Sequence, residues 1–71
     1  MDVINIMSWK LRFKAFKKGM KKYTGKMLSN REIGEITGNT RDSIQVVTSK
    51  EDKFPRWAKL AVWVYETMKN D

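Results

Sequence analysis

The chain has no cysteine and no histidine among its 71 residues. Without cysteine it can form no disulfide and offers no thiolate to a metal, which is compatible with a reducing cytoplasm. The absence of both residue types also removes the commonest general base, the commonest zinc ligands and the most reactive nucleophile. We therefore expect no enzymatic activity, no metal site and no cofactor.

Acidic residues are missing from a long stretch of the chain, since none lies between Val3 and Arg31. The whole sequence has 15 lysine and arginine residues against 8 aspartate and glutamate residues, a formal charge of +7. This excess of positive charge favours binding to a polyanion, such as duplex DNA, RNA, an anionic membrane surface or an acidic protein face. It is also typical of a helix face that is simply exposed to solvent. The basic residues of the stretch are Lys10, Arg12, Lys14, Lys17, Lys18, Lys21, Lys22, Lys26 and Arg31.

Long apolar runs are also missing: no run of 18 apolar residues and no signal-peptide pattern occurs. We expect a protein that stays in the cytoplasm of the cell that makes it, a bacterium or a phage-infected host, without a membrane partner or a small-molecule substrate. Its length is that of one domain near the lower limit for a self-sufficient hydrophobic core. Dimerisation or ligand binding is therefore expected to add stability.

Residues 1–7 are apolar and β-branched but too few to distinguish a strand, an arm and the start of a helix. Val3, Ile4 and Met7 do not continue the apolar stripe of the segment after them. This favours a separate N-terminal arm, which covers a partner subunit or packs on the domain's own core. Residues 8–71 are then a single domain.

From Ser8 onward, apolar residues recur at steps of four and three, which predicts a helix of about 15 residues. Gly19 lies inside it at a cost of about 1 kcal/mol relative to alanine, so the helix frays or ends there. Gly25 is a plausible C-terminal cap in either case. The core-facing stripe consists of Trp9, Phe13, Phe16, Met20 and Tyr23.

Two short helices joined by a glycine turn are predicted within residues 29–49, over 30–37 and 41–49. The first begins with the capping-box spacing of Ser29 and Glu32. The caps and packing residues of the pair include Gly38 as a left-handed stop, Thr40 as the next N-cap, Gly34 as a residue that leaves room where the helices cross, and the inward-facing Ile33, Ile44 and Val47.

Phe54 and Pro55 mark the start of a last helix over residues 55–69, because proline suits the first turn of a helix and disfavours helix before it. The polar residues 50–53 before it are expected to form a loop. One face of this helix should close the core, and it carries Trp57, Leu60, Ala61, Val64 and Met68.

The order Arg31-Glu32-Ile33-Gly34-Glu35-Ile36-Thr37-Gly38-Asn39-Thr40-Arg41 resembles the helix-turn-helix of small phage Cro, repressor and CII-like regulators. The segment Phe54-Pro55-Arg56-Trp57-Ala58-Lys59-Leu60-Ala61 also resembles the helix that follows the recognition helix in phage regulators. The resemblance implies an all-α, lambda-repressor-like fold, a compact bundle of four to five short helices that contains a helix-turn-helix. It also implies binding to double-stranded DNA.

The outward face of the helix over 41–49 is the candidate base-reading surface. Arg41 can pair bidentately with guanine and Gln45 with adenine, each contributing about 1 to 3 kcal/mol of discrimination. Asp42 either accepts from cytosine or favours the helix N-terminus, and Val46 either touches a thymine methyl or is an ordinary surface residue. The candidate contacts to the DNA backbone are Thr40 and Ser49, which are otherwise helix caps, together with Asn30, Arg31, Lys50 and Lys53.

A single module of this size binds an operator weakly, whereas two copies spaced by about one helical turn bind usefully. We therefore expect a homodimer on a pseudo-palindromic site. The last helix has apolar surface on a second side, which marks a subunit interface or packs against the arm. The candidate interface residues are Val62, Trp63 and Tyr65.

The favoured function is a sequence-specific transcriptional regulator, a repressor of a phage or mobile element. An alternative is a small basic protein that binds and inhibits an acidic host protein, because helix-turn-helix scaffolds are reused in this way. A recombination accessory factor and an RNA-binding protein are further alternatives.

Overall fold

The computed structural model describes residues 8–69, and within them all regular secondary structure is helical. The expected all-α bundle of four to five short helices is confirmed. The expected N-terminal arm, residues 1–7, lies outside the described part. The elements are α1 (Trp9–Gly19), α2 (Lys21–Thr24), α3 (Asn30–Thr37), α4 (Arg41–Val47), the short 3-10 helix η2 (Glu51–Lys53) and α5 (Arg56–Lys69).

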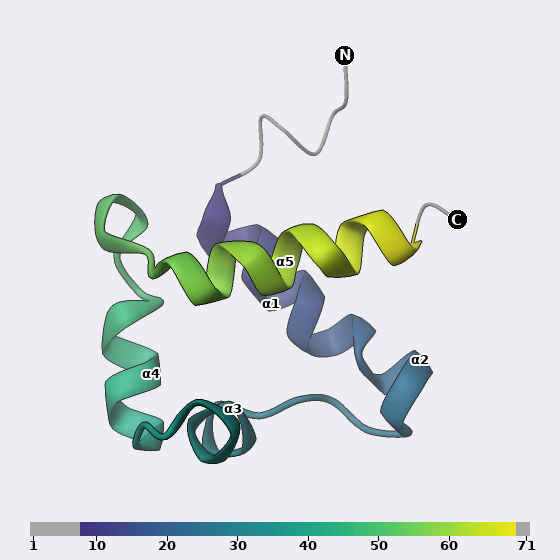
Figure 1. Ribbon diagram of the computed structural model, residues 1–71, viewed down its shortest axis with the longest axis horizontal. Coiled ribbons are helices and arrows are strands. Elements are labelled where there is room, and N and C mark those ends of the chain that lie inside the picture. The colour runs from purple at the N-terminus through teal and green to yellow at the C-terminus, as the bar shows by residue number, and fades with distance from the viewer. Residues whose placement is uncertain (1–7, 70–71) are drawn as a thin grey trace.

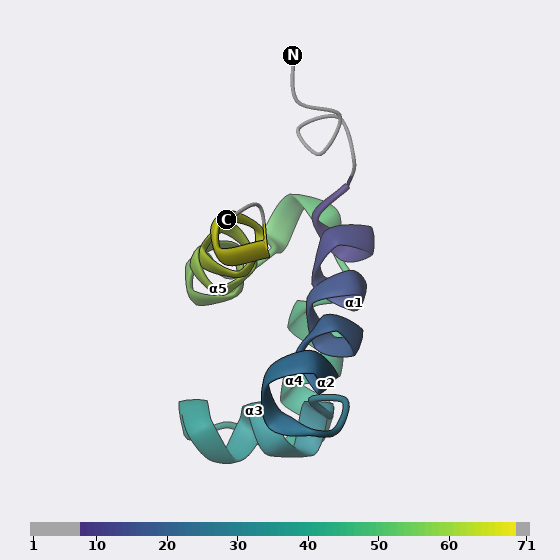
Figure 2. The same cartoon turned by 90° about the vertical axis from the view of Figure 1, so that its right-hand side faces the viewer.

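The helices form an open arrangement that extends 35 × 31 × 14 Å. α5 crosses in front of α1, α4 runs along one edge, and α3 is seen end-on below them (Figure 1). Viewed from the side, α5 and α3 project to the same side of α1 (Figure 2). None of the helices in the described part is long and apolar enough to cross a membrane.

The single helix predicted from Ser8 onward is divided into α1 and α2 at Met20. α2 ends at Gly25, whose φ of 86° is left-handed, as the sequence predicts. Gly19 has a role that its sequence position does not reveal. A Cβ at this position would overlap the hydroxyl oxygen of Tyr65, so the glycine allows α5 to pack directly onto the end of α1.

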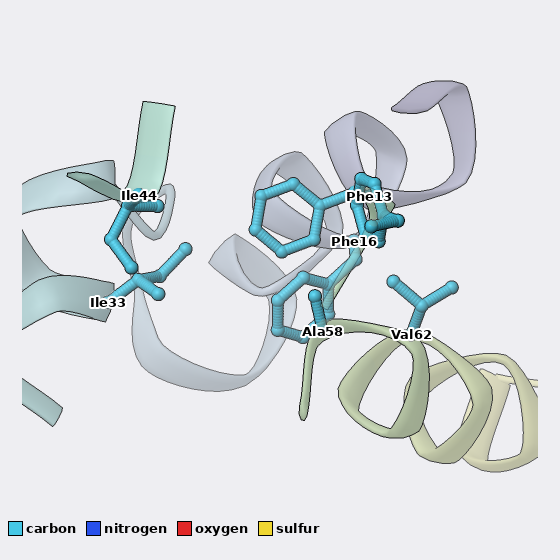
Figure 3. Packing of buried hydrophobic residues seen from close by; sticks show 7 residues of the cluster. Phe13, Phe16, Ile33, Ile44, Ala58 and Val62 are labelled. Carbon is cyan, nitrogen blue, oxygen red and sulfur yellow. The ribbon is translucent and has the colours of Figure 1, made fainter. Parts of the chain in front are cut away.

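The core is centred on the contact between α1 and α5 (Figure 3). The rings of Phe13 and Phe54 meet edge to face with centroids 5.5 Å apart, and aromatic pairs favour this geometry. One aliphatic residue each from α3 and α4 completes the cluster. Its buried members are Phe13, Phe16, Ile33, Ile44, Phe54, Ala58 and Val62.

The predicted core face of α5 is partly wrong. Trp57 and Ala61 pack against the core, but Leu60 is 61% exposed, and Val64 and Met68 are exposed as well. Ala58 and Val62 are fully buried in their place. The bulky phenylalanines of α1 fill the space between the helices, so α5 turns a small and a β-branched side chain towards them.

One basic residue of the acid-free stretch belongs to the core rather than to the surface. Arg12 is buried and its guanidinium makes two bonds to the Glu66 carboxylate, of 2.9 Å and 2.6 Å. It also stacks on Trp9, 4.1 Å from the ring centroid. A planar guanidinium suits such a paired and stacked site. The ion pair joins α1 to α5 across 54 positions of sequence.

The segment expected to be a loop, residues 50–53, contains η2 and holds the start of α1. The Glu51 carboxylate accepts hydrogen bonds from the backbone N–H groups of Trp9 and Lys10, at 2.7 Å and 3.1 Å. Ser8 accepts from the Leu11 N–H, so side chains satisfy three free donors of this helix end. The connection after α4 is therefore fixed to the first turn of α1.

Candidate nucleic-acid interface

The α3–α4 unit is built from local hydrogen bonds that the sequence predicts. Ser29 Oγ accepts from the Glu32 N–H at 3.2 Å, and the Glu32 carboxylate accepts from the Ser29 N–H at 3.3 Å, which completes the capping box. Gly38 ends α3 with a φ of 77°. Thr40 Oγ1 then accepts from the Ser43 N–H at 3.1 Å and begins α4.

Gly34 sets how closely the turn folds back onto α3. A Cβ at this position would overlap the carbonyl oxygen of Asn39 and lie 3.2 Å from its carbonyl carbon. The Asn39 N–H donates to the Gly34 carbonyl at 2.7 Å. The glycine therefore leaves room for the backbone of the turn rather than for a side chain of α4.

α4 has one buried and one exposed side. Ile44 is fully buried and the other inward-facing residue, Val47, is half-buried, while Arg41, Gln45 and Val46 are exposed. α4 ends at Val47 rather than at residue 49 as predicted. The surface beside this face is a shallow hollow lined by Asp42, Gln45, Val46 and Ser49.

The predicted base-reading residues therefore lie on one surface, but three side chains of this surface have local partners. Arg41 and Asp42 form an ion pair at 3.6 Å, with both side chains largely exposed. Ser49 lies beyond the end of α4, where its hydroxyl donates to the Val46 carbonyl at 2.7 Å. The Gln45 side chain is exposed, so its amide can both donate and accept hydrogen bonds on the exposed side of α4.

The candidate backbone contacts are more dispersed. Asn30 Oδ1 accepts from the Lys17 ammonium at 3.0 Å, which ties the start of α3 to α1. Arg31 lies 3.7 Å from the Glu35 carboxylate, and both are exposed. Lys50 and Lys53 are exposed at the two ends of η2, next to α4 in sequence.

Two pKa shifts occur beside this unit. Burial lowers the pKa of Lys17, and the positive charge of Lys14 lowers it further. A hydrogen bond from Lys26 lowers the pKa of Glu32, and the hydrogen bonds from Ser29 act in the same direction. Both shifts belong to groups that hold α3 in place.

The positive charge of the chain is not centred on α4. Residues 30–56 contain five basic and five acidic residues, so this segment has no net formal charge. Residues 8–28 contain eight basic residues and no acid. The exposed lysines of α1 and α2 are Lys10, Lys14, Lys18, Lys21 and Lys22.

One of the three candidate interface residues is misplaced. Val62 is fully buried in the core of a single chain, so it is not available to a partner. Tyr65 is half-buried and its ring meets those of Phe16 and Tyr23 with centroids 5.7 Å and 6.4 Å away. Trp63 is 61% exposed.

These elements define a small all-α domain in which a capped helix pair presents a mixed polar and apolar face. Within residues 8–69 no group of three or more acidic, histidine or cysteine side chains is placed to hold a metal. Comparison with protein-family models, curated proteins and solved structures finds no match to the chain.

Proposed function

We propose that the chain is a sequence-specific transcriptional regulator that binds duplex DNA through α4. The observation that carries the proposal is the two-sided character of α4. It is anchored by the fully buried Ile44 and begins at a Thr40 cap, and it exposes Arg41, Gln45 and Val46 on its other side. An α-helix with its side chains is about 10 to 12 Å in diameter, which a major groove about 12 Å wide admits.

In this proposal the α3–turn–α4 unit acts as a helix-turn-helix. Arg41 and Gln45 discriminate bases, with guanine and adenine as their geometric partners. Asp42 balances Arg41 in the free protein, so DNA binding must exchange that ion pair for a contact to a base. Lys50 and Lys53 contact phosphates beside α4.

The separation of charge gives the acid-free part of the chain a different role. The exposed lysines of α1 and α2 raise the local concentration of DNA by long-range attraction, while the neutral α3–α4 segment supplies the sequence preference. The same separation favours one second candidate, the binding of an acidic host protein by α1 and α2. That candidate predicts only weak and sequence-independent DNA binding.

We further propose that two copies bind a pseudo-palindromic site, in keeping with a phage or mobile-element repressor. Trp63 is the remaining member of the expected interface with a mainly exposed side chain, and Leu60 is equally exposed one turn before it. Sedimentation at micromolar concentration should show a dimer in the presence of DNA. A monomer both with and without DNA would contradict this part of the proposal.

The deciding experiment is selection of bound sequences from a random duplex library. We expect enrichment of one motif and a preference for it of at least about a thousandfold over random duplex. Arg41→Ala with Gln45→Ala should remove the preference, whereas Thr67→Ala on the exposed part of α5 should retain it. A library without enrichment would refute the regulator and leave the acidic-protein candidate.

A further inference from the structure

An apolar groove runs between α5 and the corner formed by α1 and α2. It has a volume of about 300 Å³. Several of its side chains are largely open to solvent, with Tyr23 44%, Val64 43% and Met68 50% exposed. The lining residues are Phe16, Met20, Tyr23, Ala61, Val64, Tyr65 and Met68.

The groove continues along α5 towards α3. Phe16 and Ala61 also line a second apolar hollow of about 130 Å³. Its other residues are Leu28, Ile33, Ile36, Thr37 and Trp57. The two hollows share Phe16 and Ala61 and lie next to each other beside α5; together they are termed the trough. α5 and α3 project to the same side of α1 (Figure 2).

One lysine lies beside the apolar lining of the larger hollow, and the helices that form the hollow carry others. The Lys22 ammonium lies 6.0 Å from the centroid of the Tyr23 ring. Lys21 and Lys69 are exposed and adjoin the lining residues Met20 and Met68 in sequence. Glu66 is the single acidic residue among the described residues of α1, α2 and α5, and its carboxylate is bound to Arg12.

We propose that this trough binds an amphipathic helix of a partner protein, with an apolar stripe flanked by acidic residues. A helix in a groove is held by apolar anchors at positions i, i+3 or i+4, and i+7, and the two hollows offer consecutive places for such anchors. Acidic flanks would meet the lysines at the rim. The site uses no residue of the α4 face, but it shares Lys21 and Lys22 with the long-range attraction of DNA proposed above.

Charge argues against a second copy of the chain as the occupant. α1 has no acid, and the acid of α5 is bound internally, so the two longest helices of the described chain would bring lysines to a lysine-rimmed groove. Like charges placed opposite each other at an interface oppose association. An acidic partner with an apolar stripe can contact the apolar lining of the trough and pair with the lysines beside it.

The test uses two synthetic helical peptides of 18 residues with leucines at the same positions, one with glutamates and one with lysines on the flanks. Fluorescence anisotropy should show that the full-length protein binds the acidic peptide at least about tenfold more tightly than the basic one. Amide shifts of the labelled protein should locate the acidic peptide between α5 and α2. Equal binding of both peptides, or shifts centred on α4, would overturn the proposal.

Matched variants locate the site and its charge. Met68→Glu should lower the affinity for the acidic peptide by at least about tenfold, because it places a negative charge in the groove. Leu11→Glu, at a similarly exposed apolar position of α1, should leave that affinity unchanged. Lys22→Glu in α2 should weaken binding of the acidic peptide more than Lys10→Glu in the first turn of α1. If Met68→Glu instead converts a dimer to a monomer in sedimentation, the occupant is a second copy and the proposal fails.

Discussion

The α3–α4 unit and the α1–α5 pair are stabilised by different kinds of contact. α3 and α4 depend on short-range features: a capping box, a left-handed glycine and a threonine cap. α1 and α5 depend on partners far apart in sequence, with stacked and edge-on rings, a buried ion pair and a tyrosine packed on a glycine. The ends of α3 and α4 are therefore set by neighbouring residues, whereas the contact between α1 and α5 depends on residues from opposite ends of the described chain.

The two regions also differ in charge. The segment from α3 to the start of α5 is neutral, and residues 8–28 contain no acid. In the function proposed above, discrimination between sequences and attraction to a polyanion therefore lie on separate elements. Variants should be able to change one without the other.

The largest effect is expected from removing the ion-pair partner in the α1–α5 region. Glu66→Ala removes the carboxylate that accepts two hydrogen bonds from the buried Arg12 guanidinium and should lower the free energy of unfolding by about 3 kcal/mol. Urea unfolding followed by circular dichroism measures the change. Replacement of the pair by Arg12→Met with Glu66→Leu should recover most of the loss, since an apolar pair needs no charge balance. Equal destabilisation by Glu66→Ala and by the double variant would show that lost packing, and not the unbalanced charge, causes the loss of stability.

In the α3–α4 unit the largest effect is expected at Gly34. Gly34→Ala would force a Cβ against the backbone of Asn39 and should lower the free energy of unfolding by about 3 kcal/mol. Gly38→Asn is the matched control, because asparagine tolerates a left-handed conformation and nothing surrounds this position. A small effect of Gly34→Ala in urea unfolding would mean that the turn can move away from α3.

The division of charge can be tested with the exposed lysine row of α1. Replacing Lys10, Lys14 and Lys18 by alanine should slow association with a selected duplex by about tenfold at low salt and leave the preference over random duplex unchanged. Stopped-flow binding and competition assays separate the two quantities. Loss of the preference itself would place these lysines at the reading surface.

A smaller effect is expected where η2 holds α1. Glu51→Ala removes both hydrogen bonds to the first turn of α1 and should cost about 1 kcal/mol, a usual value for a helix cap. Hydrogen exchange should become faster at the amides of Trp9 and Lys10. Asp52→Ala, at the neighbouring exposed acid, should leave both amides protected.

The smallest effect concerns pH. Because the pKa of Glu32 is lowered in the folded chain, its contribution is present above the unfolded pKa and is lost as the pH falls through the folded pKa. Glu32→Gln retains a capping-box hydrogen bond but not the ion pair with Lys26, so its thermal midpoint should fall less between neutral and acid pH. Glu35→Gln removes an acid from the same helix without touching the capping box. If Glu32→Gln and Glu35→Gln reduce the fall of the thermal midpoint equally, the pH dependence does not come from Glu32.

The sequence was sufficient wherever the physical cause was local. The capping box at Ser29, the left-handed Gly38 and the burial of Phe13 and Phe16 are confirmed, because each depends on neighbours within a turn or two, whereas Tyr23, at the end of the predicted stripe, is 44% exposed. The same patterns predict that α4 has an outward face. Its exposed side chains could therefore be named in advance, but their function could not be established.

The sequence was insufficient where the cause lies across the fold. Hydrophobic periodicity gave α5 the wrong core face, because the shape of the space left by α1 decides which residues fit. The sequence places Arg12 among the basic residues of the acid-free stretch, and no neighbouring residue indicates that it pairs with Glu66. Glu51 gave no signal either, because the backbone groups that it caps lie 42 and 41 positions away.

Tyr65 and Gly19 also constrain how this sequence can change over time. The tyrosine hydroxyl occupies the volume that any side chain at position 19 would need. The two positions should therefore covary: a homologue with alanine or serine at 19 should carry a shorter residue at 65. A substitution at 65 that comes first would spare the chain the intermediate in which the tyrosine ring has to move away from α1.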